Sequence, residues 1–200
     1  MPNLAELDPV TARRFRTGRP CLDFVHTGGV GKWTAAELIH DARDLGRWLA
    51  FVLETDQVTA RSKDLPPAIE LRESLWQLAQ QRVAGEPLDA AHVAVVNAAA
   101  ARRSIAPQLT LDGRGWQPIR TTGSRALAAL ARDAVDLFAG PFAHRIRTCA
   151  APDCGFLFVD SSRPGRRRWC SMQRCGNRTK VRTYRSRIDQ RTGDRARSLA

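Results

Sequence analysis

Four of the five cysteines lie near the C-terminal end and form two pairs with the same internal spacing, Cys149-x4-Cys154-x15-Cys170-x4-Cys175. Four thiolates satisfy the tetrahedral preference of Zn²⁺, and a site closed by four protein ligands leaves no position for a catalytic water. We therefore predict one structural zinc ion. The alternatives are disulfide bonds, an iron–sulfur cluster or isolated thiols. Such clustering in a chain that we expect to be cytoplasmic favours a metal.

The residues between the two pairs must bring both onto one ion. We predict a β-hairpin there, with a strand over residues 155–159, a turn over 160–165 and a return strand over 166–169. Cys175 would then begin a helix, an order of elements that resembles a treble-clef zinc fold. The segment has few large apolar side chains, so the metal must supply much of its stability.

The helix expected after Cys175 has three kinds of surface at about 100° per residue. Val181, Tyr184 and Ile188 form a narrow apolar stripe, which we expect to pack on the hairpin. Cationic flanks border the stripe, and a polar face lies opposite it. The flanks are Arg178, Arg182 and Arg185 on one side and Lys180, Arg187 and Arg191 on the other, and the polar face is Thr179, Thr183, Ser186 and Gln190.

This pattern predicts a helix that lies in the major groove of DNA, with the flanks on phosphates and the polar face on base edges. Arg166, Arg167 and Arg168 in the hairpin are expected to add phosphate contacts. We expect Asn177 to cap the helix, and Trp169 and Tyr184 to pack in the core rather than stack on bases. The alternative is a solvated basic helix on a purely structural module.

The charge distribution supports a polyanionic partner. The formal net charge is +12, and it is concentrated near the C-terminal end. Residues 1–144 contain 17 Lys and Arg against 16 Asp and Glu, whereas residues 145–200 contain 15 against 4. We therefore divide the chain into an N-terminal domain over 1–144, a zinc finger over 145–191 and a basic tail over 192–200 that we expect to be mobile.

Two segments resemble known families. Cys175-Gly176-Asn177-Arg178, within WCSMQRCGNRTKVRTYRSR, resembles the CGNR zinc finger over roughly residues 145–190. CLDFVHT followed by DLGRWL resembles the ABATE domain, proposed to be a stress-induced transcription regulator, although His26 stands where that family commonly has Asn. The resemblance implies a nucleic-acid-binding regulator.

The N-terminal part reads as a mainly α-helical domain, ordered from about residue 17, with one small β-hairpin over residues 108–120. Helices are expected over 34–53 behind a Thr34/Glu37 capping box, from about Pro67 to a stop at Gly85, after Asp89, and from a Ser124 cap to Gly140-Pro141. Cys21 is expected in the core. GGVGK fails the phosphate-loop pattern, so Gly28, Gly29 and Gly31 are predicted to form a turn.

Several function classes are disfavoured by the sequence. No apolar stretch is long enough to span a membrane and the first residues lack the apolar core of a signal peptide, so we expect a cytoplasmic protein. His26, His40, His92 and His144 form no pair with metal-ligand spacing, and we expect no enzyme. The favoured function is a DNA-binding transcription regulator, with an N-terminal domain that senses a small molecule or forms a homodimer. The alternatives are an RNA-binding protein and a protein-interaction adaptor.

Overall fold

The computed structural model describes residues 17–29, 37–106, 109, 111, 120–182 and 184–185. Its α-helices are α2 (Pro20–Val25), α3 (Ala42–Val52), α4 (Leu65–Ala84), α5 (Ala90–Ala100) and α6 (Gly123–Ala139). Its strands are β1 (Gln57–Thr59), β2 (Arg120–Thr122), β3 (Ile146–Thr148) and β4 (Leu157–Val159). Short 3-10 turns span Ser62–Asp64 and Ala143–Arg145, and a π-helical turn spans Met172–Gly176.

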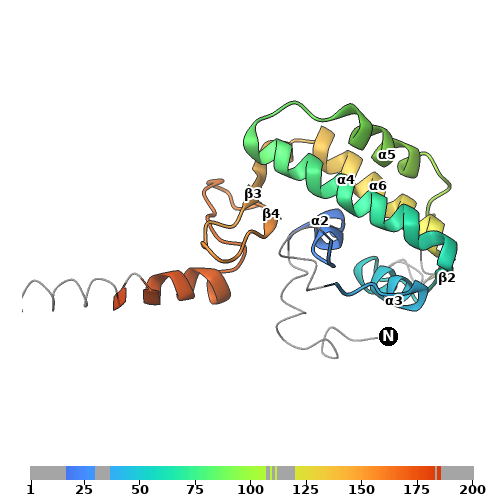
Figure 1. Ribbon diagram of the computed structural model, residues 1–200, viewed down its shortest axis with the longest axis horizontal. Coiled ribbons are helices and arrows are strands. Elements are labelled where there is room, and N and C mark those ends of the chain that lie inside the picture. The colour runs from blue at the N-terminus through green and yellow to red at the C-terminus, as the bar shows by residue number, and fades with distance from the viewer. Residues whose placement is uncertain are drawn as a thin grey trace, which may run out of the picture.

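The N-terminal part is built on the two longest helices, α4 and α6. Figure 1 shows them between α5 on one side and α2 and α3 on the other. The fully buried side chains of this core include Leu22, Phe24, Leu45, Leu49, Leu71, Leu75, Leu130 and Leu137. Cys21 is completely buried among them, as predicted. Together with the C-terminal cysteine cluster, this confirms the predicted fold class.

Helix ends follow local chemistry at most positions. The predicted stop of α4 is confirmed, because Gly85 adopts the left-handed conformation (φ +75°) that a residue without Cβ tolerates best. α5 begins after Asp89, whose carboxylate accepts hydrogen bonds from the amides of Ala91 and His92. Gly28 and Gly29 both have positive φ, in agreement with the predicted turn, while Gly31 lies outside the described residues.

Two predicted helix starts are wrong. The helix expected from Thr34 begins instead after Asp41, whose side chain accepts from the Asp44 amide. Thr34 lies outside the described residues, and the Glu37 carboxylate binds the side chain of Arg72. The last helix is capped by Thr122 rather than Ser124, since the Thr122 hydroxyl accepts from the Arg125 amide.

The predicted hairpin over residues 108–120 lies mostly outside the described residues. At its end, β2 pairs in parallel with β1, with Val58 opposite Thr121. The partner of β2 is therefore a strand more than sixty positions earlier, which local sequence patterns do not reveal. In the part of the chain that the structure describes, no helix is both long and apolar enough to cross a bilayer.

The antiparallel pair β3–β4 joins the C-terminal module to the helices. Ile146, Leu157 and Val159 belong to the main hydrophobic core, whereas Phe158 packs beside the cysteines. The Val159 amide donates to the carbonyl oxygen of Thr17 at 2.8 Å, so backbone hydrogen bonding continues across the junction. The two faces of β4 thus belong to different cores, and the module is seated on the helical domain.

Candidate metal centre and nucleic-acid interface

The four clustered cysteines converge as predicted. Their Sγ atoms all lie within 4.8 Å of one another. Two of the separations are 3.6 Å, between Cys154 and Cys170, and 3.7 Å, between Cys170 and Cys175. A tetrahedral site with Zn–S bonds of about 2.3 Å requires sulfur atoms about 3.8 Å apart. The donor set and its spacing therefore fit one Zn²⁺ ion, which would have four protein ligands and a structural role.

The backbone holds each cysteine pair in a tight turn. The Cys154 amide donates to Ala151 O at 3.0 Å, and the Cys175 amide donates to Ser171 O at 2.9 Å. The two turns are tied together, because the Ala150 amide donates to Arg168 O at 2.8 Å and the Cys170 amide lies 3.4 Å from Cys149 Sγ. Amide donors near a thiolate sulfur stabilise its charge, which favours metal binding.

The thiols perturb one another strongly at this range. Hydrogen bonds from Cys154 and Cys170 lower the pKa of the Cys149 thiol, and the same contacts with Cys149 raise the pKa values of Cys154 and Cys170. Four thiolates this close repel one another, and a divalent cation at their centre removes that repulsion. The convergence of the four sulfur donors therefore agrees with the zinc prediction.

The prediction of the hairpin named the wrong partner strand: it paired residues 155–159 with residues 166–169, which follow them. β4 pairs with β3, which precedes Cys149, so the first cysteine pair forms the connection of the hairpin. Residues 166–168 form no strand, although the Arg168 carbonyl accepts the one bond from Ala150. The physical reason is the Ile146 side chain, which is 1% exposed and anchors β3 in the helical core.

The connection after β4 is held by the buried carboxylate of Asp160 and the half-buried guanidinium of Arg145. The Asp160 carboxylate accepts hydrogen bonds from the Ser162 and Arg167 amides at 3.0 and 2.8 Å. Burial alone would raise the pKa of this carboxyl, but these hydrogen bonds outweigh burial and lower it. Arg145 donates to the Ser162 carbonyl at 2.7 Å. The loop that leads to Cys170 is therefore rigidly placed.

The helix after Cys175 was predicted correctly, but its rotation was not. The π-helical turn leads into α-helical residues 177–182 and 184–185. Val181 and Tyr184, expected to face the hairpin, are 50% and 67% exposed. Thr179 lies on the half-buried side of the helix, where its hydroxyl donates to Cys175 O at 2.7 Å; its contact with base edges stays a prediction.

Cys175 itself explains the rotation. Its side chain must point to the other three sulfur atoms, and it is completely buried. At about 100° per residue, Thr179 falls about 40° from Cys175, whereas Tyr184 falls about 180° away. The position of Cys175 in the sequence thus indicates which face of the helix is buried, and it decides this more strongly than the short apolar stripe does. Asn177 lies within the helical run, and Ser171 provides the cap by accepting from the Arg174 amide.

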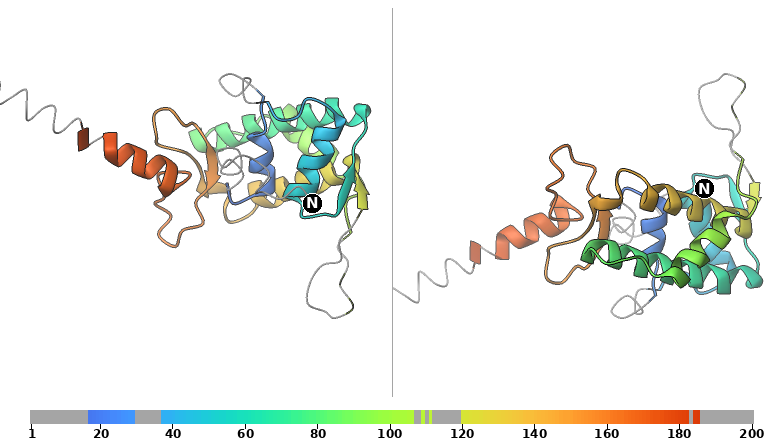
Figure 2. Two further views of the ribbon diagram at one scale, coloured as in Figure 1. Left: turned by 90° about the horizontal axis from the view of Figure 1, so that it is seen from below. Right: turned by 90° about the horizontal axis from the view of Figure 1, so that it is seen from above.

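The helix extends away from the rest of the chain. In the three views of Figures 1 and 2, only its beginning lies against the module. Lys180, Arg182 and Arg185 are exposed along it. The remaining residues that we predicted to contact nucleic acid, namely Thr183, Ser186, Arg187, Gln190 and Arg191, lie outside the described residues, as does the tail over 192–200.

An acidic side chain from the first cysteine turn contacts this helix. Asp153 pairs with Arg178 at 3.0 Å and lies 3.7 Å from Arg182. Both arginines fall within about 60° of Cys175 around the helix axis, which places them on the side nearest the metal turn. We predicted both as phosphate contacts and did not foresee their carboxylate partner, because Asp153 is distant in sequence.

The three consecutive arginines have different environments. Arg167 donates to the carbonyl oxygens of Trp169 and Cys170, and its guanidinium lies 4.7 Å from the centre of the Phe158 ring. It therefore supports the second cysteine pair, and its contact with phosphate stays a prediction. Arg166 is exposed, and Arg168 is exposed with its guanidinium over the Trp169 ring. Trp169 itself is half-buried against the cysteine cluster, as expected of a core residue.

Comparison with known proteins gives two family matches. Residues 18–141 match ABATE, described as "Putative stress-induced transcription regulator", and residues 145–188 match the CGNR zinc finger. No curated protein matches the chain significantly. The second match contains all four converging cysteines, and it agrees with a single structural Zn²⁺. The ABATE match covers more than half of the chain. The chain therefore belongs to the ABATE family, and its metal centre is a CGNR zinc finger.

Proposed function

We propose that this protein is a DNA-binding transcription regulator without catalytic activity, whose zinc finger binds the duplex through the helix that follows Cys175. One observation carries the proposal. The first turn of this helix is fixed by a metal ligand, while its later residues extend from the module with exposed cationic side chains. A rigidly anchored basic helix is a common means of entering the major groove.

We assign the duplex contacts to the exposed cations of the helix and the module. Lys180, Arg182 and Arg185 are exposed and can reach phosphate oxygens. Arg166 and Arg168 supply further positive charge on the module. One short helix reads few base pairs, so we propose that two copies bind together to reach useful specificity.

The test is selection of bound sequences from a random duplex pool by the zinc-loaded protein, with chelator-treated protein as the control. Enrichment of a sequence motif that depends on zinc supports the proposal. Structured RNA is then added as a competitor at fixed salt. If RNA displaces the duplex at lower concentration than unlabelled duplex does, the regulator proposal fails in favour of RNA binding.

Salt dependence tests the phosphate contacts directly. With six or more contacts, log affinity should fall against log salt with a slope of at least about 5 in magnitude. Arg182→Gln and Arg185→Gln should each reduce this slope by about 1. Arg47→Gln removes another exposed charge, from α3, and is the matched control. A flat dependence, or an equal effect of all three variants, contradicts the proposed interface.

A further inference from the structure

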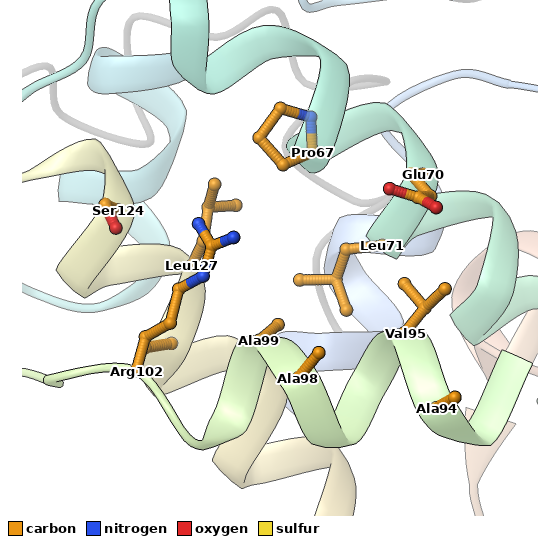
Figure 3. Close-up of a pocket in the computed structure, with 11 residues that line it drawn as sticks. Pro67, Glu70, Leu71, Ala94, Val95, Ala98, Ala99, Arg102, Ser124 and Leu127 are labelled. Atoms are coloured by element: carbon orange, nitrogen blue, oxygen red, sulfur yellow. The ribbon is translucent and has the colours of Figure 1, made fainter.

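A cavity of about 280 Å³ lies where α4, α5 and α6 meet, away from the metal centre. Figure 3 shows Leu71, Val95, Ala98 and Leu127 around it, and its walls are mainly apolar. An engineered cavity of about 150 Å³ suffices for benzene, and sites for larger ligands begin near about 300 Å³. The space therefore suits a compact organic molecule with one ring or a short branched chain.

The cavity exists because of the composition of α5. Of the four residues of α5 that line the cavity, three are alanines, Ala94, Ala98 and Ala99, where larger side chains would fill the space. α5 is nevertheless held firmly at its C-terminal end. The Arg132 guanidinium donates to Ala100 O at 2.9 Å and to Arg102 O at 3.0 Å. The cavity thus lies between helices that hydrogen bonds hold in place, and the backbone of Arg102 is held beside it.

The polar groups around the cavity are few, and the two charged ones, Arg102 and Glu70, are exposed and opposite in charge. Figure 3 shows Arg102 and Ser124 on one side of the cavity and Glu70 on the other. Among the described residues, neither Arg102 nor Glu70 forms an ion pair. A guanidinium binds a carboxylate through two parallel hydrogen bonds, and Glu70 would repel a second anionic group at the far side.

We infer that this cavity is a binding site for a small monocarboxylate with a compact apolar body. The apolar part occupies the space between Leu71 and Leu127, and the carboxylate binds Arg102. Glu70 selects against dicarboxylates of similar length. This inference does not depend on nucleic-acid binding, because the site lies on the helical domain and can be tested without nucleic acid.

The experiment measures binding of three probes that share one apolar body to the full-length, zinc-loaded protein. The probes are 3-phenylpropionate, 3-phenylpropanol and 3-phenylpropylamine, titrated by protein-observed NMR or calorimetry. We expect the carboxylate to bind with a dissociation constant near or below about 1 mM, and the alcohol and the amine to bind at least about tenfold more weakly.

Variants locate the site. Arg102→Gln should weaken binding of the carboxylate probe about tenfold, while Arg103→Gln, the exposed neighbour outside the cavity, should leave it unchanged. Ala98→Leu places a larger side chain in the opening from an exposed position, and it should abolish binding without impairing folding. Glu70→Gln should improve binding of the dicarboxylate 1,4-phenylenediacetate relative to 3-phenylpropionate.

The outcomes that overturn the inference are equally specific. It fails if 3-phenylpropionate shows no binding up to about 10 mM, or if the three probes bind with equal affinity. It also fails if Ala98→Leu binds the carboxylate like the unmodified protein, since binding would then occur elsewhere. Equal losses in Arg102→Gln and Arg103→Gln would likewise show that general charge, rather than this cavity, attracts the probe.

Discussion

The carboxylate of Asp153 lies 3.0 Å from the guanidinium of Arg178, so a side chain of the first cysteine turn forms an ion pair with an arginine at the start of the projecting helix. The same carboxylate lies 3.7 Å from Arg182. Exposed ion pairs of this kind contribute little to stability, in general about 0–1 kcal/mol. Their larger effect is electrostatic, because a fixed carboxylate competes with phosphate for the same arginines.

Asp153→Asn should therefore strengthen binding to duplex DNA. We expect an affinity increase of about two- to fivefold at low salt that diminishes at high salt, since the competing charge is removed. Fluorescence anisotropy with a labelled duplex measures this change. Asp56→Asn, an exposed position before β1, makes the same change in net charge and is the control. Equal gains in both variants would show that net charge alone is responsible.

Zinc content should depend on the clustered cysteines alone. Atomic spectroscopy of the purified protein should find one zinc ion per chain, and Cys175→Ser should reduce zinc to near zero. Cys21→Ala should retain the full zinc content, because Cys21 lies in the helical core. Chelation should melt the module, since the cysteine cluster has only a small apolar core of its own. Retention of one zinc ion by Cys175→Ser would contradict the site.

Tyr184→Ala tests the rotation of the helix. In this structure Tyr184 is 67% exposed, so its removal should change the free energy of unfolding by no more than about 0.5 kcal/mol. Phe158→Ala, at a fully buried position of β4, should cost about 3–5 kcal/mol. Urea unfolding of the zinc-loaded proteins measures both. A loss of about 2 kcal/mol or more in Tyr184→Ala would mean that this side chain packs on the module.

The pH dependence of stability should carry the signature of Asp23. Burial raises the pKa of this carboxyl from 3.8 to about 7, despite the hydrogen bond from the Thr17 amide. The folded state therefore holds the proton more tightly than the unfolded chain. The stability that the folded state gains from holding this proton is fully present below about pH 4 and is lost as the pH rises to about 7.

Asp23→Asn should remove the loss of stability between about pH 4 and 7, because the amide keeps an oxygen acceptor for Thr17 and does not ionise. We expect the variant to be more stable than the unmodified protein at about pH 8, by on the order of 2 kcal/mol, and to lose this advantage toward about pH 5.5. Urea unfolding in zinc-containing buffer across this range gives the comparison. Parallel stability curves for the two proteins would contradict the assigned burial.

The metal centre was readable from the sequence because its information is local. Two cysteine pairs with equal spacing specify the ligands whatever the path of the chain between them, and the charge asymmetry marks the same segment. The end of α4 at Gly85 and the start of α5 after Asp89 were equally accessible. In each case a neighbouring residue satisfies or terminates the backbone hydrogen bonding.

Other features depend on contacts between distant segments. The pairing of β1 with β2 and the contact of Asp153 with Arg178 each join residues that no local pattern relates. The apolar stripe at Val181 and Tyr184 has the same periodicity whether it is covered or exposed, and the direction of Cys175 toward the other three sulfurs decides which occurs. Periodicity in a sequence defines the faces of a helix, but only packing in three dimensions determines which face is buried.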